Sequence, residues 1–158
     1  MSLPEPEAQN NPPVRLLAAF QIAFDGDEPD VIVQAPGRDL WLAASTTAER
    51  TVQIFAPDLG RHTAFSFRSA RARKTLLRRP LPAWARYVAG VIVGLYADGR
   101  DVPGLRLVAL GDELPGPRYH HALGVAVAAL LHTLWQQTVA DNALVEIVER
   151  ARRDYVEA

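Results

Sequence analysis

Positively charged and histidine side chains gather just before a strongly apolar stretch, at Arg118, His120 and His121, next to Gly116. Arg118 and His120 could attract an anion electrostatically. Adjacent residues on a helix point about 100° apart, and no carboxylate motif flanks His120 and His121 at helical spacing, so these two are poor partners on one metal ion. The segment therefore suggests weak anion binding and no metal site.

A second group of candidate residues is the basic segment from Arg68 to Arg79, which carries six cations among twelve residues. Such a density of charge could meet the phosphates of nucleic acid. The segment has no interleaved aromatic residues for base stacking, and the whole chain has a net charge of -1. A solvated loop is therefore the preferred interpretation, and nucleic-acid binding through this segment remains the weaker alternative.

The other polar residues form no recognisable catalytic set. His132 lies one position from the buried face of its predicted helix, which indicates a hydrogen-bonded structural histidine. Glu146 and Glu149 lie on a charged helix face, where we expect solvated side chains rather than an acid–base pair. The sequence contains no Ser-His-Asp order and no nucleophile elbow. It also contains no cysteine, which excludes disulfides, thiolate catalysis and cysteine-based zinc sites.

Composition fits one ordinary domain. The chain has 158 residues, of which 49% are hydrophobic and 22% charged, enough to bury a core. The N-terminus has no basic region followed by an apolar run, so no signal peptide is expected. The longest apolar stretch, residues 125–131, falls short of the roughly 20 residues that span a bilayer. We expect a cytoplasmic protein with no membrane partner.

Periodicity predicts the elements that must position these residues. Residues 1–13 contain four prolines and no periodicity, which predicts a disordered tail and leaves 14–158 as a single domain. Apolar spacing predicts helices over 14–24, 84–96, 121–135 and 143–155, and strands over 31–33, 51–55, 62–67 and 105–110, with 51–67 forming a hairpin. Residues 40–43 form a further apolar run after the interruption at Pro36 and Gly37. This order predicts an α+β fold, a mixed β-sheet with helices packed on one face.

Two groups of residues, taken in order, resemble the N-terminal domain of galactokinases, which are members of the GHMP kinase superfamily. Residues 34–38, Gln-Ala-Pro-Gly-Arg, keep the opening of the family's first motif. Residues 84–92 resemble its Trp-Ala-Asn-Tyr-Val-x-Gly-Val helix, and residues 124–127 its next buried helix. The resemblance covers roughly residues 15–155. It implies the GHMP kinase N-terminal fold, also called the ribosomal protein S5 domain 2-like fold.

The sugar-binding positions of that family depart from the pattern. The family motif continues Val-Asn-Leu-Ile-Gly-Glu-His-Thr-Asp-Tyr, and its sugar-binding glutamate, histidine and aspartate would fall here on Ala44, Ser45 and Thr47. Each sugar hydroxyl left unpaired costs about 1–3 kcal/mol, so three lost contacts would abolish useful affinity. A family segment before the next hairpin also looks deleted, because Glu49 and Arg50 lead directly into a strand.

The family's phosphate loop, Pro-x-Gly-x-Gly-Leu-Ser-Ser-Ser-Ala, is equally altered. Residues 114–122 read Leu-Pro-Gly-Pro-Arg-Tyr-His-His-Ala, about two residues shorter. Gly116 remains, between prolines that have no N–H to donate. Bulky residues replace the serines and are expected to occupy the space of the phosphates. Gly116, Arg118 and His120 are the candidate residues of this degenerate loop.

The resemblance therefore implies a GHMP kinase domain that is truncated and degenerate. Arg38 is the one retained active-site candidate, and its alternative role is a strand-end arginine paired with Asp39 or Asp58. The family's Gly-Ile-Met-Asp-Gln motif, which supplies the catalytic aspartate, has no counterpart before Ala158.

These departures favour a non-catalytic interaction or regulatory module without a cofactor. We expect it to form a homo-oligomer or to bind a protein over the surface of the missing C-terminal domain. The alternative is a residual galactokinase-type enzyme that uses ATP and Mg and is completed by another chain.

Overall fold

A five-stranded mixed sheet organises the chain, and the computed structural model describes residues 12–158 of it. The expected tail over residues 1–13 therefore lies almost entirely outside the described residues. The strands are β1 (Val31–Gln34), β2 (Trp41–Thr47), β3 (Thr51–Ala56), β4 (Arg61–Ser66) and β5 (Gly104–Leu110). Their spatial order is β1-β2-β5-β3-β4, antiparallel except where β3 and β5 run parallel. The predicted α+β class with a mixed sheet is confirmed.

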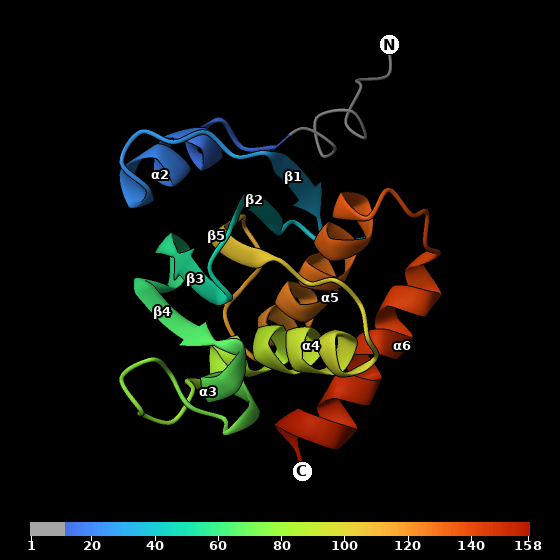
Figure 1. The fold of residues 1–158 in the computed structure, drawn as a ribbon. Coiled ribbons are helices and arrows are strands. Elements are labelled where there is room, and N and C mark those ends of the chain that lie inside the picture. Colours follow the sequence, from blue (N-terminus) through green and yellow to red (C-terminus); the bar gives the residue numbers. More distant parts are fainter. Residues whose placement is uncertain (1–11) are drawn as a thin grey trace.

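Helices lie on both sides of this sheet (Figure 1). The described helices are α2 (Val14–Ala23), α3 (Phe67–Arg71), α4 (Arg86–Ala97), α5 (Pro117–Leu134) and α6 (Asp141–Ala151), which continues into a wider π-helical turn over Arg152–Val156. Short 3-10 turns occupy Pro57–Leu59 and Ala83–Ala85. In Figure 1, α2 lies apart from α4, α5 and α6, with the sheet between them.

The burial of β2 and β5 on both faces explains this arrangement. Leu42 and Ala44 belong to the large core under α4, α5 and α6, whereas Trp41 and Ala43 belong to a smaller cluster under α2. Side chains alternate between the two faces of a strand, so a strand covered on both faces reads as a continuous apolar run. The predicted helices do cover one face, and the structure adds α2 on the other.

The basic segment differs from the predicted loop at its beginning. Ser66 accepts a hydrogen bond from the backbone N–H of Ser69, and the Ser69 hydroxyl accepts one from the N–H of Ser66. This reciprocal pair caps α3, so the first part of the basic segment is helical.

In the part of the chain that the structure describes, no helix is long and apolar enough to cross a membrane.

Candidate functional site

A hollow of about 580 Å³ opens where β5 leads into α5, and its lining includes three of the predicted site residues, Arg38, Gly116 and Arg118. Arg38 follows β1 and the other two precede or begin α5, so the turn after β1 and the loop after β5 meet at the same end of the sheet. No side chain caps the N-terminus of α5, which leaves the positive end of the helix dipole facing this region. The hollow is the candidate anion site.

Two carboxylates in the lining of the hollow oppose that role. Arg38 Nη1 lies 3.3 Å from Glu113 Oε1, and the Glu113 side chain is only 15% exposed. The alternative predicted for Arg38 was a pair with Asp39 or Asp58, and the structure corrects the partner to Glu113. Asp112 also lines the hollow. An incoming phosphate would meet the charge of Glu113 and would compete with it for Arg38.

A second set of contacts fixes the loop after β5, and sequence reasoning missed it. Arg15 of α2 reaches both Asp58, at 3.6 Å, and Asp112, at 3.3 Å. The Asp58 carboxylate also accepts a hydrogen bond from the N–H of Gly111, at 2.9 Å. The acidic pair Asp112 and Glu113, directly after a buried strand, was the sequence signal that could have pointed to these contacts.

Of the three bulky residues that replace the serines, Arg118 lines the hollow, whereas Tyr119 and His120 do not. Tyr119 is fully buried, and its ring packs in the core beneath the sheet. Burial, and then the nearby charge of Asp58, raise the pKa of Tyr119 well above its ordinary value. The candidate His120 is half-buried and is absent from the lining of the hollow. The space beside Gly116 is therefore open.

His120 should make the stability of the domain depend on pH. Burial lowers its pKa below the ordinary value near 6.5. Between these two pKa values the unfolded chain binds more protons at His120 than the folded chain does. The free energy of unfolding is therefore highest above about pH 6.5 and decreases as the pH falls toward the pKa of the folded state. We expect His120→Asn to flatten this part of the profile, measured by urea unfolding from pH 8 to pH 5.5. A variant whose profile keeps the slope of the wild type would contradict this assignment.

The three predicted sugar positions lie inside β2 rather than in a loop. Ala44 is fully buried and pairs with Val31 of β1 and Leu107 of β5. Ser45 is 8% exposed, and no hydrogen-bond partner for its hydroxyl is found among residues 12–158. Thr47 lies opposite Gly104 at the end of β2. None of the three lines the hollow beside Arg38.

The remaining candidates take structural roles. The Nδ1 of His132 lies 2.7 Å from the carbonyl oxygen of Ala128, which confirms the predicted hydrogen-bonded histidine. His121 Nε2 lies 3.1 Å from Glu149 Oε2, and Arg152 also binds Glu149, so the Glu149 side chain is ion-paired as well as 32% exposed. The hydrogen bond from Arg152 is the main reason that the pKa of Glu149 is lowered. Among the described residues, no group of three or more acidic or histidine side chains could hold a metal ion.

Comparisons with known proteins agree with the fold described above. No protein-family model matches the sequence. A provisionally named galactokinase of Treponema pallidum (strain Nichols) is 29% identical over an alignment of 155 residues, gaps included. The alignment covers 83% of this chain and 38% of that protein. The crystal structure of Lactococcus lactis galactokinase complexed with galactose matches 91% of this chain and 42% of that one, with a TM-score of 0.67 at 17% identity. Methanococcus jannaschii mevalonate kinase matches with a TM-score of 0.54 at 7% identity and covers 77% of this chain and 37% of that one.

The fold and the order of elements define the class as the fold of GHMP kinases. Within that class the chain is a galactokinase-like domain, and it spans about two fifths of the length of the relatives that it matches.

Proposed function

We propose that this galactokinase-like domain binds neither sugar nor nucleotide with useful affinity and acts as a non-catalytic interaction or regulatory module. The observation that carries the proposal is the short connection of residues 35–40 between β1 and β2, which leaves Ala44, Ser45 and Thr47 within β2 rather than in a loop. Ala44 and Ser45 are buried there and are not available to a ligand, and Thr47 is half-buried.

The connection between β1 and β2 supports the loss of the sugar site. Only residues 35–40 join the two strands, because β1 ends at Gln34 and β2 begins at Trp41. The ten-residue motif that supplies sugar ligands in galactokinases cannot fit in six residues. We infer that this motif is itself deleted, and that residues 41–47 correspond to the strand that follows it.

Charge at the hollow supports the loss of the nucleotide site. A phosphate loop presents several backbone N–H groups to its ligand. Here Pro115 and Pro117 remove two of these donors, on either side of Gly116. The Glu113 carboxylate forms an ion pair with Arg38, the retained candidate for contact with a phosphate. An anion in this hollow would therefore gain few hydrogen bonds and would be repelled by the carboxylates of Asp112 and Glu113.

Exposed apolar residues support a role in protein contacts. Val14, Leu17 and Ile22 of α2 are 92%, 48% and 84% exposed, although α2 already packs its other face on the sheet. Exposed apolar residues near one another on a helix occur at protein–protein contacts. We propose that a second protein chain covers this face, most simply another copy of this one.

The test is thermal unfolding with Mg-ATP, Mg-ADP and galactose, singly and together, at millimolar concentration. A ligand at 100 times its dissociation constant would stabilise the domain by about 2.7 kcal/mol, which would raise the Tm by roughly 5–11 °C. We expect no change with any of them. A rise that disappears in Arg118→Gln would contradict the proposal, because it would place the nucleotide in the hollow. Sedimentation that shows only monomer at high concentration would remove the support for self-association.

A residual sugar kinase completed by another chain is the second candidate function. It is favoured by the open hollow and by Arg118, for which no acidic partner is found in the part of the chain that the structure describes. It predicts the opposite result in the same experiment. Mg-ATP would raise the Tm, and Glu113→Gln would increase the rise by releasing Arg38.

A further inference from the structure

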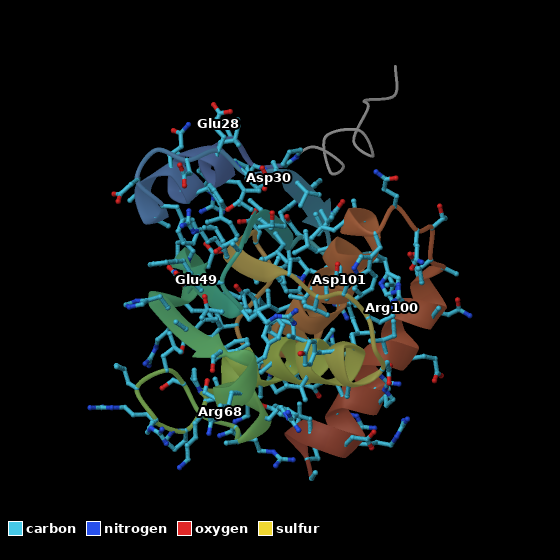
Figure 2. The ribbon with its side chains drawn as sticks, in the orientation of Figure 1. Glu28, Asp30, Glu49, Arg68, Arg100 and Asp101 are labelled. Atoms are coloured by element: carbon cyan, nitrogen blue, oxygen red, sulfur yellow. The ribbon has the colours of Figure 1, made fainter. Side chains whose placement is uncertain are left out.

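Cations without acidic partners gather at the end of the sheet opposite the hollow. Residues 62–97 contain seven lysines and arginines and no aspartate or glutamate, although the chain as a whole carries 17 basic and 18 acidic residues. Every ion pair found among residues 12–158 involves a basic residue outside this stretch. Figure 2 shows Arg68 on the opposite side of the molecule from Glu28 and Asp30. A region of positive potential therefore exists on a chain whose net charge is close to zero.

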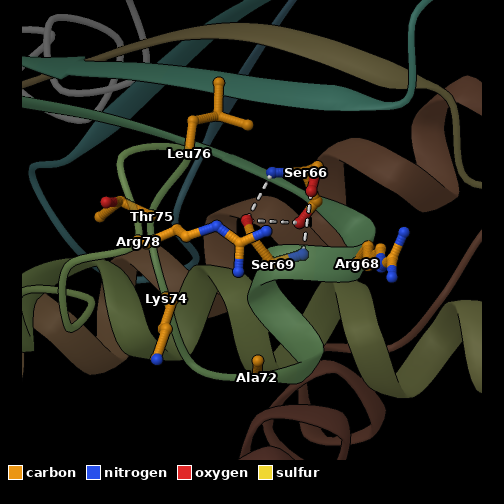
Figure 3. A pocket seen from close by; sticks show the side chains of 8 residues that line it. All are labelled: Ser66, Arg68, Ser69, Ala72, Lys74, Thr75, Leu76 and Arg78. Atoms are coloured by element: carbon orange, nitrogen blue, oxygen red, sulfur yellow. Dashed lines mark hydrogen bonds between the residues drawn. The ribbon is translucent and has the colours of Figure 1, made fainter.

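Three of these cations line a second hollow, of about 250 Å³. Arg68, Lys74 and Arg78 surround it together with the hydroxyl-bearing Ser66, Ser69 and Thr75. Figure 3 shows the side chain of Arg78 extending across the hollow toward Ser66 and Ser69. No hydrogen bond or ion pair of these three side chains is found among the described residues, so their charged groups are free to meet a ligand.

The loop that carries Lys74 and Arg78 is built by hydrogen bonds rather than left open to solvent. The backbone N–H of Thr75 donates to the carbonyl of Arg79, and the N–H of Arg78 donates to the carbonyl of Thr75. These two hydrogen bonds close a tight turn. The N–H of Leu76 binds the carbonyl of Ala64 on the edge strand β4, at 2.9 Å. The backbone of the turn is therefore fastened to the sheet, which places the Cα atoms of Lys74 and Arg78 beside the hollow before any ligand arrives.

Backbone conformation at Arg78 also points to a ligand. Its φ is 62°, a left-handed value that is rare for a residue with a side chain. Asn or Gly would adopt this φ at lower cost. Strain of this kind gathers at sites where a side chain must be held in one place, and here it places a guanidinium over the hollow.

We propose that this second hollow, lined by Arg68, Lys74 and Arg78, binds a phosphate group carried by a small molecule. A phosphate monoester has about two negative charges and three acceptor oxygens, which suits the fork of an arginine with two further cations around it. The hollow is smaller than the roughly 300–1,000 Å³ of ordinary ligand pockets, so it fits the phosphate group and little of its carrier. No aromatic side chain lines it, which argues against stacked bases.

This site is independent of the hollow beside Gly116. The two share no lining residue. β4 runs antiparallel to β3, and β3 runs parallel to β5, so the segment after β4 and the loop after β5 lie at opposite ends of the sheet. Failure of this proposal would leave the proposed function unchanged, and the reverse also holds.

The experiment is a titration of the full chain with sodium pyrophosphate, followed by amide chemical shifts in NMR and by calorimetry. We expect saturable binding of one equivalent, with shifts centred on Ser66, Ser69 and Thr75. Arg78→Asn removes the charge and tolerates the left-handed φ, and it should weaken binding about tenfold or more. Arg79→Asn is the matched control, because Arg79 lies in the same turn and does not line the hollow. It should weaken binding by less than about twofold.

Three outcomes would overturn the proposal. One is the absence of saturable binding at millimolar pyrophosphate. Another is an equal loss in Arg78→Asn and Arg79→Asn, which would indicate a diffuse field rather than a site. The third is a single-stranded oligonucleotide that binds far more tightly than pyrophosphate with a steep dependence on salt, which would make the surface a nucleic-acid interface. If Arg78→Asn failed to fold, Lys74→Gln would be compared with Arg79→Asn in the same way.

Discussion

Gly104→Ala should destabilise the domain by about 3 kcal/mol or more, whereas Gly94→Ala should leave its stability unchanged or raise it by up to about 1 kcal/mol. A Cβ at Gly104 would overlap the carbonyl oxygen of Glu49 and would also press on the Thr47 side chain. Backbone at that place cannot move without breaking the start of β5, where Gly104 pairs with Thr47. At Gly94, inside α4, a Cβ would meet only the tip of the flexible Arg150 side chain, at 3.3 Å.

Urea unfolding of the two variants beside the wild type measures both effects. Gly94→Ala is the matched control, since the same methyl group is added and only the surroundings differ. Alanine also favours a helix interior over glycine. Failure of Gly104→Ala to fold while Gly94→Ala folds normally would agree with the expectation. A Gly104→Ala variant within about 0.5 kcal/mol of the wild type would show that the turn at Glu49 can move away from the start of β5 at little cost.

Apolar spacing was sufficient to predict the main elements, because each of them has a buried face. The hairpin of β3 and β4 and the helices α4, α5 and α6 were predicted near their actual bounds. The packing of α2 on the second face of the sheet was not predicted. An apolar run such as residues 40–44 indicates that a strand is buried but does not indicate which element packs on it. The helix α3 was missed for a different reason. Its cap is a pair of serines three residues apart, a weaker signal than a serine followed by a glutamate.

The candidate sites show what sequence comparison alone does not give. Matching residues one by one placed the family's sugar-binding positions on Ala44, Ser45 and Thr47, and strand pairing shows that these residues lie in the sheet. The deletion that we propose rests on this register, which the sequence alone does not supply. The same limit applies to Arg38. Sequence proximity suggested Asp39 as its partner, whereas the partner found, Glu113, comes from a loop that is adjacent only in the fold.

The contacts of Tyr155 link the C-terminus to the basic segment and lead to the second large prediction. Its ring occupies the space that Gly90 leaves open on α4, where an added Cβ would lie 3.0 Å from the ring. Its hydroxyl donates to the carbonyl of Ala70 in α3. Burial raises the pKa of Tyr155 to about 12, so the hydroxyl keeps its proton at every pH at which the domain is handled. Arg73 lies over the ring at 4.9 Å and donates to the carbonyl of Tyr155 at 3.1 Å.

Tyr155→Ala should therefore destabilise the domain by about 3–5 kcal/mol, because it leaves a cavity between α3 and α4 and removes the bond to Ala70. Tyr155→Phe keeps the ring and removes one of two hydrogen bonds to the Ala70 carbonyl, which still accepts the N–H of Arg73, so it should cost only about 0.5–1.5 kcal/mol. Tyr96→Ala is the control, since Tyr96 is 38% exposed and also contacts a neighbouring arginine, Arg50. It should cost less than Tyr155→Ala, measured by urea unfolding of all three variants.

The same variants test whether Tyr155 holds the basic loop in place. Arg73 has a left-handed φ of 59°, and its carbonyl accepts the N–H of Leu81, which closes the base of the loop. Without the ring beneath it, Arg73 loses the contact that offsets this strain. Amide exchange at Leu76 and Leu81 should then become faster in Tyr155→Ala than global unfolding alone explains, and stay near the wild-type rate in Tyr155→Phe. Equal protection of these two amides in both variants would mean that the hydrogen bonds of the turn hold the loop without help from Tyr155.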